Sequence, residues 1–77
     1  MEIIETSHWV KKNIFRQDIE LYMVEFALMN SNFQKDKNDP ALLNAIARIP
    51  QNGKILKVVF KFIGKDRVKL ITTFYLD

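Results

Sequence analysis

Residues 43–75, LNAIARIPQNGKILKVVFKFIGKDRVKLITTFY, decide the fold, because they divide into three apolar stretches separated by two turn sequences. Asn52-Gly53 is the strongest short-range indication of a hairpin, and Gly64-Lys65-Asp66 is a three-residue loop that contains a glycine. Within each stretch every second residue is mostly apolar, as in strands that are buried on one face. The sequence therefore predicts a three-stranded antiparallel meander.

Each turn also predicts a register, because loop length sets which residues face one another. A two-residue turn at Asn52-Gly53 gives the pairs Gln51–Lys54, Ile49–Leu56, Ala47–Val58, Ala45–Phe60 and Leu43–Phe62. The second loop gives the pairs Phe62–Val68, Phe60–Leu70, Val58–Thr72 and Leu56–Phe74. Apart from the Gln51–Lys54 pair at the turn and one Thr, both registers place apolar side chains on one face, and a slip of one residue would move Lys into the middle of that face.

The first of these strands has an alternative interpretation. Asp39 is a good helix N-cap, Pro40 suits the first helical position, and the Ala and Leu residues that follow favour helix, so residues 40–48 also fit a helix. The hairpin from Ile55 to Tyr75 is the same in both interpretations.

The N-terminal half predicts an edge strand and two helices. Residues 2–5 suit a short edge strand, and Thr6-Ser7 supplies an N-cap for a helix that begins near His8. Residues 17–29 repeat apolar side chains at helical spacing, over an arc wide enough to be buried on two sides or covered by a partner. Residues 30–40 are polar and predict a loop. The predicted fold class is α+β, with two N-terminal helices packed on a three- to four-stranded antiparallel sheet in one domain, residues 1–77.

Composition excludes several classes of function. The 77 residues include no Cys and one His, which excludes disulfides, thiol catalysis, zinc fingers and iron–sulfur sites and argues against a His-ligated metal. We therefore expect no metal and no cofactor. No apolar run approaches the roughly 20 residues of a membrane span, and the acidic start lacks the basic region of a signal peptide. We expect a cytoplasmic protein that does not contact membranes.

Positive charge is concentrated in the second half, where seven basic residues stand against two acidic ones. The predicted registers place five cations on the sheet face opposite the helices, around Ile46, Val59 and Ile71, together with the hydroxyls of Thr73 and Tyr75. These cations are Arg48, Lys57, Lys61, Arg67 and Lys69. Lys61 would face Lys69, and Arg48 would face Lys57. Such like-charge pairs are unfavourable unless an anion lies between them, so we expect this face to bind nucleic-acid phosphates. The alternative is a solvated face whose Lys and Arg stems cover the sheet.

Metal-free RNA cleavage through the 2′-hydroxyl needs a base, an acid and cations around the phosphate. His8 is the only side chain that titrates near neutral pH without help, and Tyr75 and Thr73 bring hydroxyls to the basic face. The candidate catalytic residues are His8, Arg48, Lys57, Thr73 and Tyr75.

Four stretches carry a resemblance to a known family: residues 8–15 (HWVKKNIF), 18–20 (DIE), 53–60 (GKILKVVF) and 68–73 (VKLITT). In order and spacing the chain resembles the small bacterial BrnT-like and related toxin-like proteins of the RelE/ParE-type fold. The resemblance implies a toxin that cleaves free or ribosome-bound RNA and is neutralised by an antitoxin protein. It assigns the activity to His8, Arg48, Lys57 and Thr72 or Thr73.

Two classes of function follow. The first is a metal-independent ribonuclease toxin of a toxin–antitoxin pair, with RNA and an antitoxin as partners. The second is a non-catalytic module that binds nucleic acid or a protein, the latter through exposed Val24 or Leu28 on the wide apolar helix. A small chain without disulfides also gains burial from a second copy, so a homodimer is a further expectation.

Overall fold

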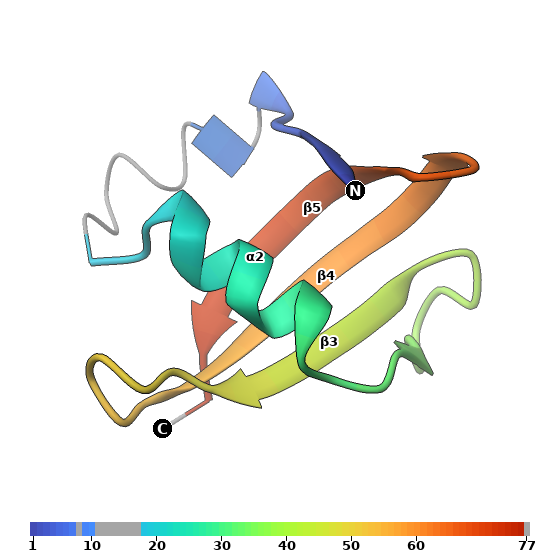
Figure 1. The fold of residues 1–77 in the computed structure, drawn as a ribbon. Helices are drawn as coiled ribbons and strands as arrows, with labels where there is room; N and C mark the ends of the chain where they lie inside the picture. The colour runs from blue at the N-terminus through green and yellow to red at the C-terminus, as the bar shows by residue number, and fades with distance from the viewer. Residues whose placement is uncertain (8, 11–17, 77) are drawn as a thin grey trace.

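A five-stranded mixed sheet with one helix lying across it forms the body of the protein (Figure 1). The computed structural model describes residues 1–7, 9–10 and 18–76. Its elements are β1 (Glu2–Ile4), α2 (Leu21–Met29), β2 (Gln34–Lys35), β3 (Leu43–Arg48), β4 (Ile55–Gly64) and β5 (Arg67–Tyr75). The strand order is β1-β5-β4-β3-β2. β1 pairs with β5 in parallel, and the other neighbours are antiparallel.

The predicted fold class, two helices on a three- to four-stranded antiparallel sheet of the RelE/ParE type, is wrong. The meander β3–β4–β5 is confirmed, and residues 43–48 form a strand rather than a helix. A two-residue edge strand, β2, forms inside the segment predicted as a loop, and β1 makes the sheet mixed. Within the described residues, α2 is the one helix whose two ends are defined.

One of the two helical predictions needs correction at its boundary, and the start of the other is confirmed. α2 begins at Leu21 rather than near residue 17, because Ile19 is buried in the core and Glu20 has extended backbone angles. The predicted N-cap at Thr6 is confirmed: its Oγ1 accepts the Trp9 N–H at 3.0 Å, and its carbonyl accepts the Val10 N–H at 3.0 Å. Most of the helix predicted after it lies outside the described residues.

The register between β3 and β4 is displaced by two residues from the prediction. Leu43 faces Phe60 and Ala45 faces Val58, because residues 50–53 form a four-residue loop instead of a two-residue turn. The Ile49 N–H donates to the Lys54 carbonyl at 2.8 Å, and the Ile49 carbonyl accepts the Gly53 N–H at 2.8 Å. A displacement of two residues keeps every side chain on its predicted face.

The register between β4 and β5 is correct at the two pairs nearest the turn and wrong beyond Leu70. The turn itself is shorter than predicted, because Gly64 belongs to β4 and faces Arg67, which leaves Lys65 and Asp66 as the turn. Phe62 faces Val68 and Phe60 faces Leu70, as predicted, but Val59 faces Thr72 and Ile71 is left as the extra residue of a β-bulge. Past the bulge, the side chains of β5 exchange faces. Thr73 and Tyr75 therefore point to the α2 side, and Thr72 and Phe74 to the other side.

The core lies between α2 and the sheet. α2 contributes Met23, Val24, Ala27 and Leu28, which pack on the apolar face of β3, β4 and β5. Val24 and Leu28 are buried, so the expectation that they form an exposed docking surface is wrong. Phe33 closes one end of this core, edge-on to Phe60 with ring centroids 4.9 Å apart.

The β3–β4 loop depends on Gly53, and this dependence gives a prediction with a matched control. Gly53 has φ +70°, where a Cβ would meet nothing within 4 Å, so Gly53→Ala adds only backbone strain. We expect it to lower the free energy of unfolding by about 1 to 2 kcal/mol in urea denaturation. Gly64 has no positive φ, and a Cβ there makes ordinary contacts with Arg67 at 3.6 Å or more, so Gly64→Ala should cost much less. Equal losses would contradict this account of the loop.

Candidate nucleic-acid interface

The sheet face turned away from α2, called the outer face below, carries a mixture of lysines and apolar side chains. Its members from the three long strands are Asn44, Ile46, Arg48, Ile55, Lys57, Val59, Lys61, Lys69, Ile71, Thr72 and Phe74. The core residues of α2 pack on the opposite face, and among the described elements no helix covers the outer face.

Three lysines of the described strands lie on this face. Lys61 faces Lys69 directly across β4 and β5, which confirms that predicted pair. The ion pairs found in the described parts of the chain involve other cations, so Lys61 and Lys69 have no carboxylate partner there. Lys57 is near enough to Asp36 for its charge to lower the pKa of that carboxyl. The facing charges of Lys61 and Lys69 are therefore held on the sheet without a neutralising anion among the described residues.

The two arginines predicted for this site are already engaged. Arg48 faces Ile55, not Lys57 as predicted, and its guanidinium donates to the Gly53 carbonyl at 2.6 Å. Arg67 forms an ion pair with Glu2 across β5 and β1. The outer face therefore relies on its lysines for available positive charge.

An aromatic ring lies beside the lysines. Phe74 faces Lys57 across the two strands, and the Lys57 ammonium lies 5.5 Å from the centre of the ring. Ile46 faces Lys57 from the other side and is 41% exposed. A cation, an aromatic ring and an exposed aliphatic side chain are thus adjacent on one surface.

The hydroxyls predicted for catalysis lie on the other side of the sheet. Thr73 is buried and accepts a hydrogen bond from the Trp9 indole N–H at 3.0 Å. The Tyr75 hydroxyl donates to the Asp18 carbonyl and accepts from the Asn52 amide, both at 3.0 Å. The sheet thus separates both hydroxyls from Lys57, Lys61 and Lys69. Thr72 is on the outer face, His8 lies outside the described residues, and the catalytic roles of all these residues stay predictions.

Sequence reasoning missed a hollow of about 340 Å³ between the β2–β3 loop and the outer face. It is lined by Gln34, Lys35, Asp36, Lys37, Asn38, Asn44, Ile46 and Lys57. Asp36 organises the loop, because its Oδ2 accepts the N–H groups of Asn38 at 3.0 Å and Asp39 at 3.1 Å. Asp followed by Asn and Asp two and three residues later is typical of such side-chain-capped turns, and this pattern could have predicted the turn within the loop.

Hydrogen bonds keep Asp36 ionised. The backbone N–H of Asn38, then the side chain of Asn44, lower the pKa of Asp36 below its usual 3.8, and the charge of Lys57 adds to this effect. The hollow therefore contains a carboxylate and an ammonium together near neutral pH.

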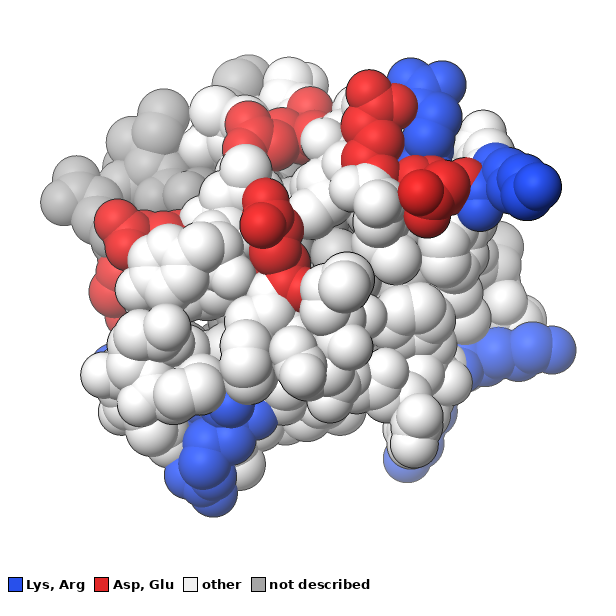
Figure 2. Space-filling view, in the orientation of Figure 1, with Lys and Arg blue, Asp and Glu red and all other residues white. Residues whose placement is uncertain are grey.

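The opposite side of the molecule has a different charge. Figure 2 shows acidic side chains gathered on the face covered by α2, with Lys and Arg at its edges. α2 itself presents Glu25 to solvent. An anionic polymer is therefore favoured on the outer face and disfavoured on the α2 face.

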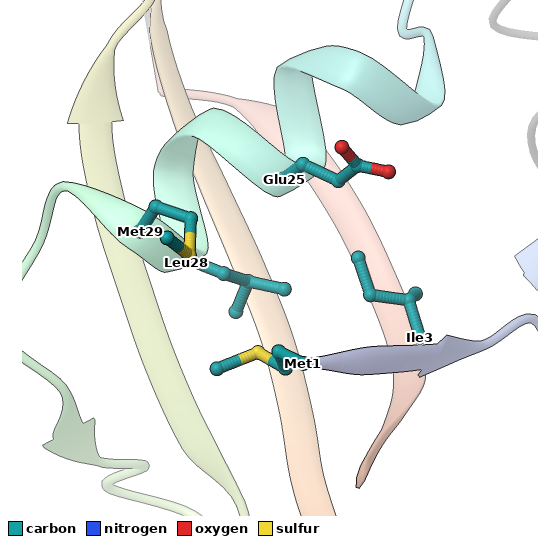
Figure 3. A pocket seen from close by; sticks show the side chains of 5 residues that line it. All are labelled: Met1, Ile3, Glu25, Leu28 and Met29. Carbon is teal, nitrogen blue, oxygen red and sulfur yellow. The ribbon is translucent and has the colours of Figure 1, made fainter. Parts of the chain in front are cut away.

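A second hollow, of about 290 Å³, lies on the α2 side between the helix and β1 (Figure 3). It is lined by Met1, Ile3, Glu25, Leu28 and Met29. Its lining side chains are apolar apart from Glu25, and none of them is a Lys or Arg that would attract a phosphate.

Comparisons with protein-family models, with curated proteins and with solved structures found no match to this chain. The toxin and antitoxin predictions thus rest on the sequence resemblance alone. The described residues contain no group of three or more His, Asp and Glu side chains suited to a metal ion. They also contain no helix long and apolar enough to cross a membrane.

The position of Tyr75 predicts a structural effect of removing its hydroxyl. Tyr75→Phe loses the hydrogen bonds to Asp18 and Asn52, which join the segment before α2, the β3–β4 loop and the end of β5. We expect the free energy of unfolding to fall by about 1 kcal/mol in urea denaturation. A variant as stable as the parent would show that the hydroxyl does not join these segments.

The lowered pKa of Asp36 predicts a dependence of stability on pH. Because the folded pKa lies below the unfolded one, ionised Asp36 stabilises the fold above its usual pKa of 3.8, and this contribution is lost as pH falls through the folded value. Between about pH 5 and pH 2, urea midpoints should therefore fall more steeply for the parent than for Asp36→Asn. Parallel acid profiles would contradict the assignment.

Proposed function

We propose that this protein binds single-stranded nucleic acid on the outer face of its sheet. The observation that carries the proposal is the pairing of Lys61 with Lys69, which have no carboxylate partner among the described residues, on a sheet face that no described helix covers and that also carries Lys57. Like charges directly across two strands destabilise a sheet, and a phosphate between them reverses the sign of that interaction.

A single strand suits this surface better than a duplex. Phe74 and Ile46 lie beside Lys57, so unstacked bases can rest on apolar side chains while phosphates meet ammonium groups. Stacking platforms combined with a basic surface are the common means by which proteins bind single strands. In a duplex the bases are already stacked and would leave these apolar contacts unused.

We propose binding without cleavage. Thr73 and Tyr75, the hydroxyls considered as proton donors, bond to Trp9, Asp18 and Asn52 on the α2 side of the sheet. A phosphate on the outer face would be separated from them by the sheet. An RNA-binding role is also consistent with the predicted cytoplasmic location.

The test compares two double variants of equal net charge. Lys61→Ala with Lys69→Ala should weaken binding to a single-stranded RNA and reduce the slope of log affinity against log salt by about 1.4, at roughly 0.7 per phosphate contact. The control, Lys54→Ala with Lys65→Ala, removes Lys54, which lies over the Tyr75 ring on the α2 side, and Lys65 at the β4–β5 turn. It should change the slope much less.

Fluorescence anisotropy over a salt series gives both quantities, and gel analysis of the same RNA shows whether it stays intact. Equal effects of the two double variants would point to nonspecific attraction by net charge and contradict the proposal. RNA cleavage that depends on the outer lysines would replace it with the ribonuclease prediction.

A further inference from the structure

We infer that β1 accepts a further strand from a protein partner, an extended segment that carries a large apolar side chain between basic ones. The surface concerned consists of the free edge of β1 and the hollow of about 290 Å³ between β1 and α2. The hollow lies on the α2 side of the sheet, so the inference does not depend on nucleic-acid binding at the outer face.

The free edge of β1 offers unpaired backbone groups. β1 is the last strand of the sheet, and among the described elements only β5 pairs with it. The Glu2 N–H donates to the Asp66 carbonyl at 2.7 Å, so in this parallel ladder the backbone groups of Glu2 and Ile4 turn towards β5. The N–H and C=O groups of Ile3 therefore point away from β5, where an added strand would meet them.

The hollow accepts a side chain at the same position along β1. Ile3 lines it from β1 and Leu28 lines it from α2, and Figure 3 shows Ile3 pointing towards the helix. A residue of an added strand that faces Ile3 has its side chain on the same face of the sheet, with the two Cβ atoms about 5 Å apart. That side chain would enter the hollow. Such a side-chain pocket beside a free strand edge is the usual source of specificity when a protein binds an extended peptide.

α2 is apolar on the side that faces solvent as well as on the side that faces the sheet. Glu25 is the one charged residue among its nine, and the exposed fractions of Tyr22 and Met29 are 44% and 72%. Met1, beside the hollow, is 46% exposed. A helix with apolar residues all round is typical of a helix that is covered on more than one side. The two methionines are flexible and can adapt to the side chain that enters.

Charge determines which segment suits this surface. Glu25 lines the hollow and takes part in none of the ion pairs found among the described residues. Acidic side chains gather on the same face of the molecule (Figure 2). In an added strand, the residues two positions before and after the one that faces Ile3 lie on its face of the sheet, and a Lys or Arg there would pair with Glu25. The acidic face and a basic segment are thus complementary.

A second copy of this chain suits the surface less well. Pairing of two β1 strands would bring together two acidic faces, each with its own Glu25 (Figure 2). Like charges across an interface are unfavourable. The acidic side chains therefore disfavour self-association at this free edge and favour a basic partner.

The first test uses a designed peptide and leaves the protein intact. In GTKTLTKTG, alternation places one Leu between two Lys on the same face of a strand. A titration followed by amide NMR, which detects weak binding, should shift the signals of β1 and of α2 around Glu25. Replacing Leu by Ala should weaken binding about tenfold, because less apolar surface enters the hollow. Absence of saturable shifts in β1 would overturn the inference.

Two methylated peptides test strand addition itself. Successive backbone N–H groups of a strand point to opposite edges, so only every second one can donate to β1. The peptide is N-methylated either at Leu or at the Thr that follows. One of these peptides should bind about tenfold more weakly than the parent, and the other should bind nearly as well. Equal effects would overturn the inference, because a side chain that fills the hollow without strand pairing does not distinguish the two edges.

The charge requirement is tested with Glu25→Gln and, as the matched control, Glu20→Gln. Glu20 directly precedes α2 and does not line the hollow. Glu25→Gln should weaken the peptide about threefold, the size of an exposed ion pair, and Glu20→Gln should change its affinity much less. Lys61→Ala with Lys69→Ala, on the outer face, should keep peptide binding. Equal weakening by the two Gln variants would point to attraction by overall charge and overturn the assigned contact.

Analytical ultracentrifugation distinguishes a protein partner from a second copy. The protein should sediment in the same oligomeric state with and without the peptide. A dimer that dissociates when the peptide binds would assign the free edge of β1 to a second copy and overturn the inference.

Discussion

The β-bulge at Ile71 determines which side chains of β5 join the core and which join the outer face. Because one extra residue is inserted opposite Val59, every side chain beyond it exchanges faces. Thr73 and Tyr75 gain partners on the α2 side, and Phe74 comes to lie beside Lys57. Without the bulge two hydroxyls would lie among the lysines and Phe74 would point into the core. The chemical character of both faces therefore depends on this single irregularity.

The two faces have complementary roles. On the α2 side, polar groups pair with distant parts of the chain, as when the Trp9 indole reaches Thr73 and the Tyr75 hydroxyl joins Asp18 to Asn52. Such bonds hold edge segments that a small core could not hold alone. On the outer face, Lys61 and Lys69 repel each other across the strands. Like-charge repulsion across a rigid sheet lowers stability, and a bound phosphate would remove that penalty.

The sequence predicted those parts of the fold that local pattern determines. Alternation and turn residues were sufficient for the meander and for the Lys61–Lys69 pair. They failed at the β3–β4 loop and in β5 beyond Leu70. Asn52-Gly53 suits a two-residue turn, but Pro50 cannot donate to a ladder, and the chain forms a four-residue loop instead. No glycine or proline stands at Ile71 or next to it to mark a bulge. Beyond the bulge, the Thr73 hydroxyl accepts the Trp9 indole N–H, a contact between residues 64 positions apart in the chain.

The same reasoning explains why the hollow at Asp36 escaped prediction although its loop is locally encoded. Asp36 and its capped turn can be read from residues 36–39, but Asn44 and Lys57 reach it only through the pairing of β2 with β3 and of β3 with β4. In sequence, Asn44 is one polar residue in an apolar strand. In the fold its side chain is buried beside the Asp36 carboxyl, whose pKa it lowers, and its Oδ1 has no hydrogen-bond partner within the described residues. A buried polar group left unpaired lowers stability. The contacts that define the hollow therefore come from strand pairing, which the local pattern of residues 36–39 does not encode.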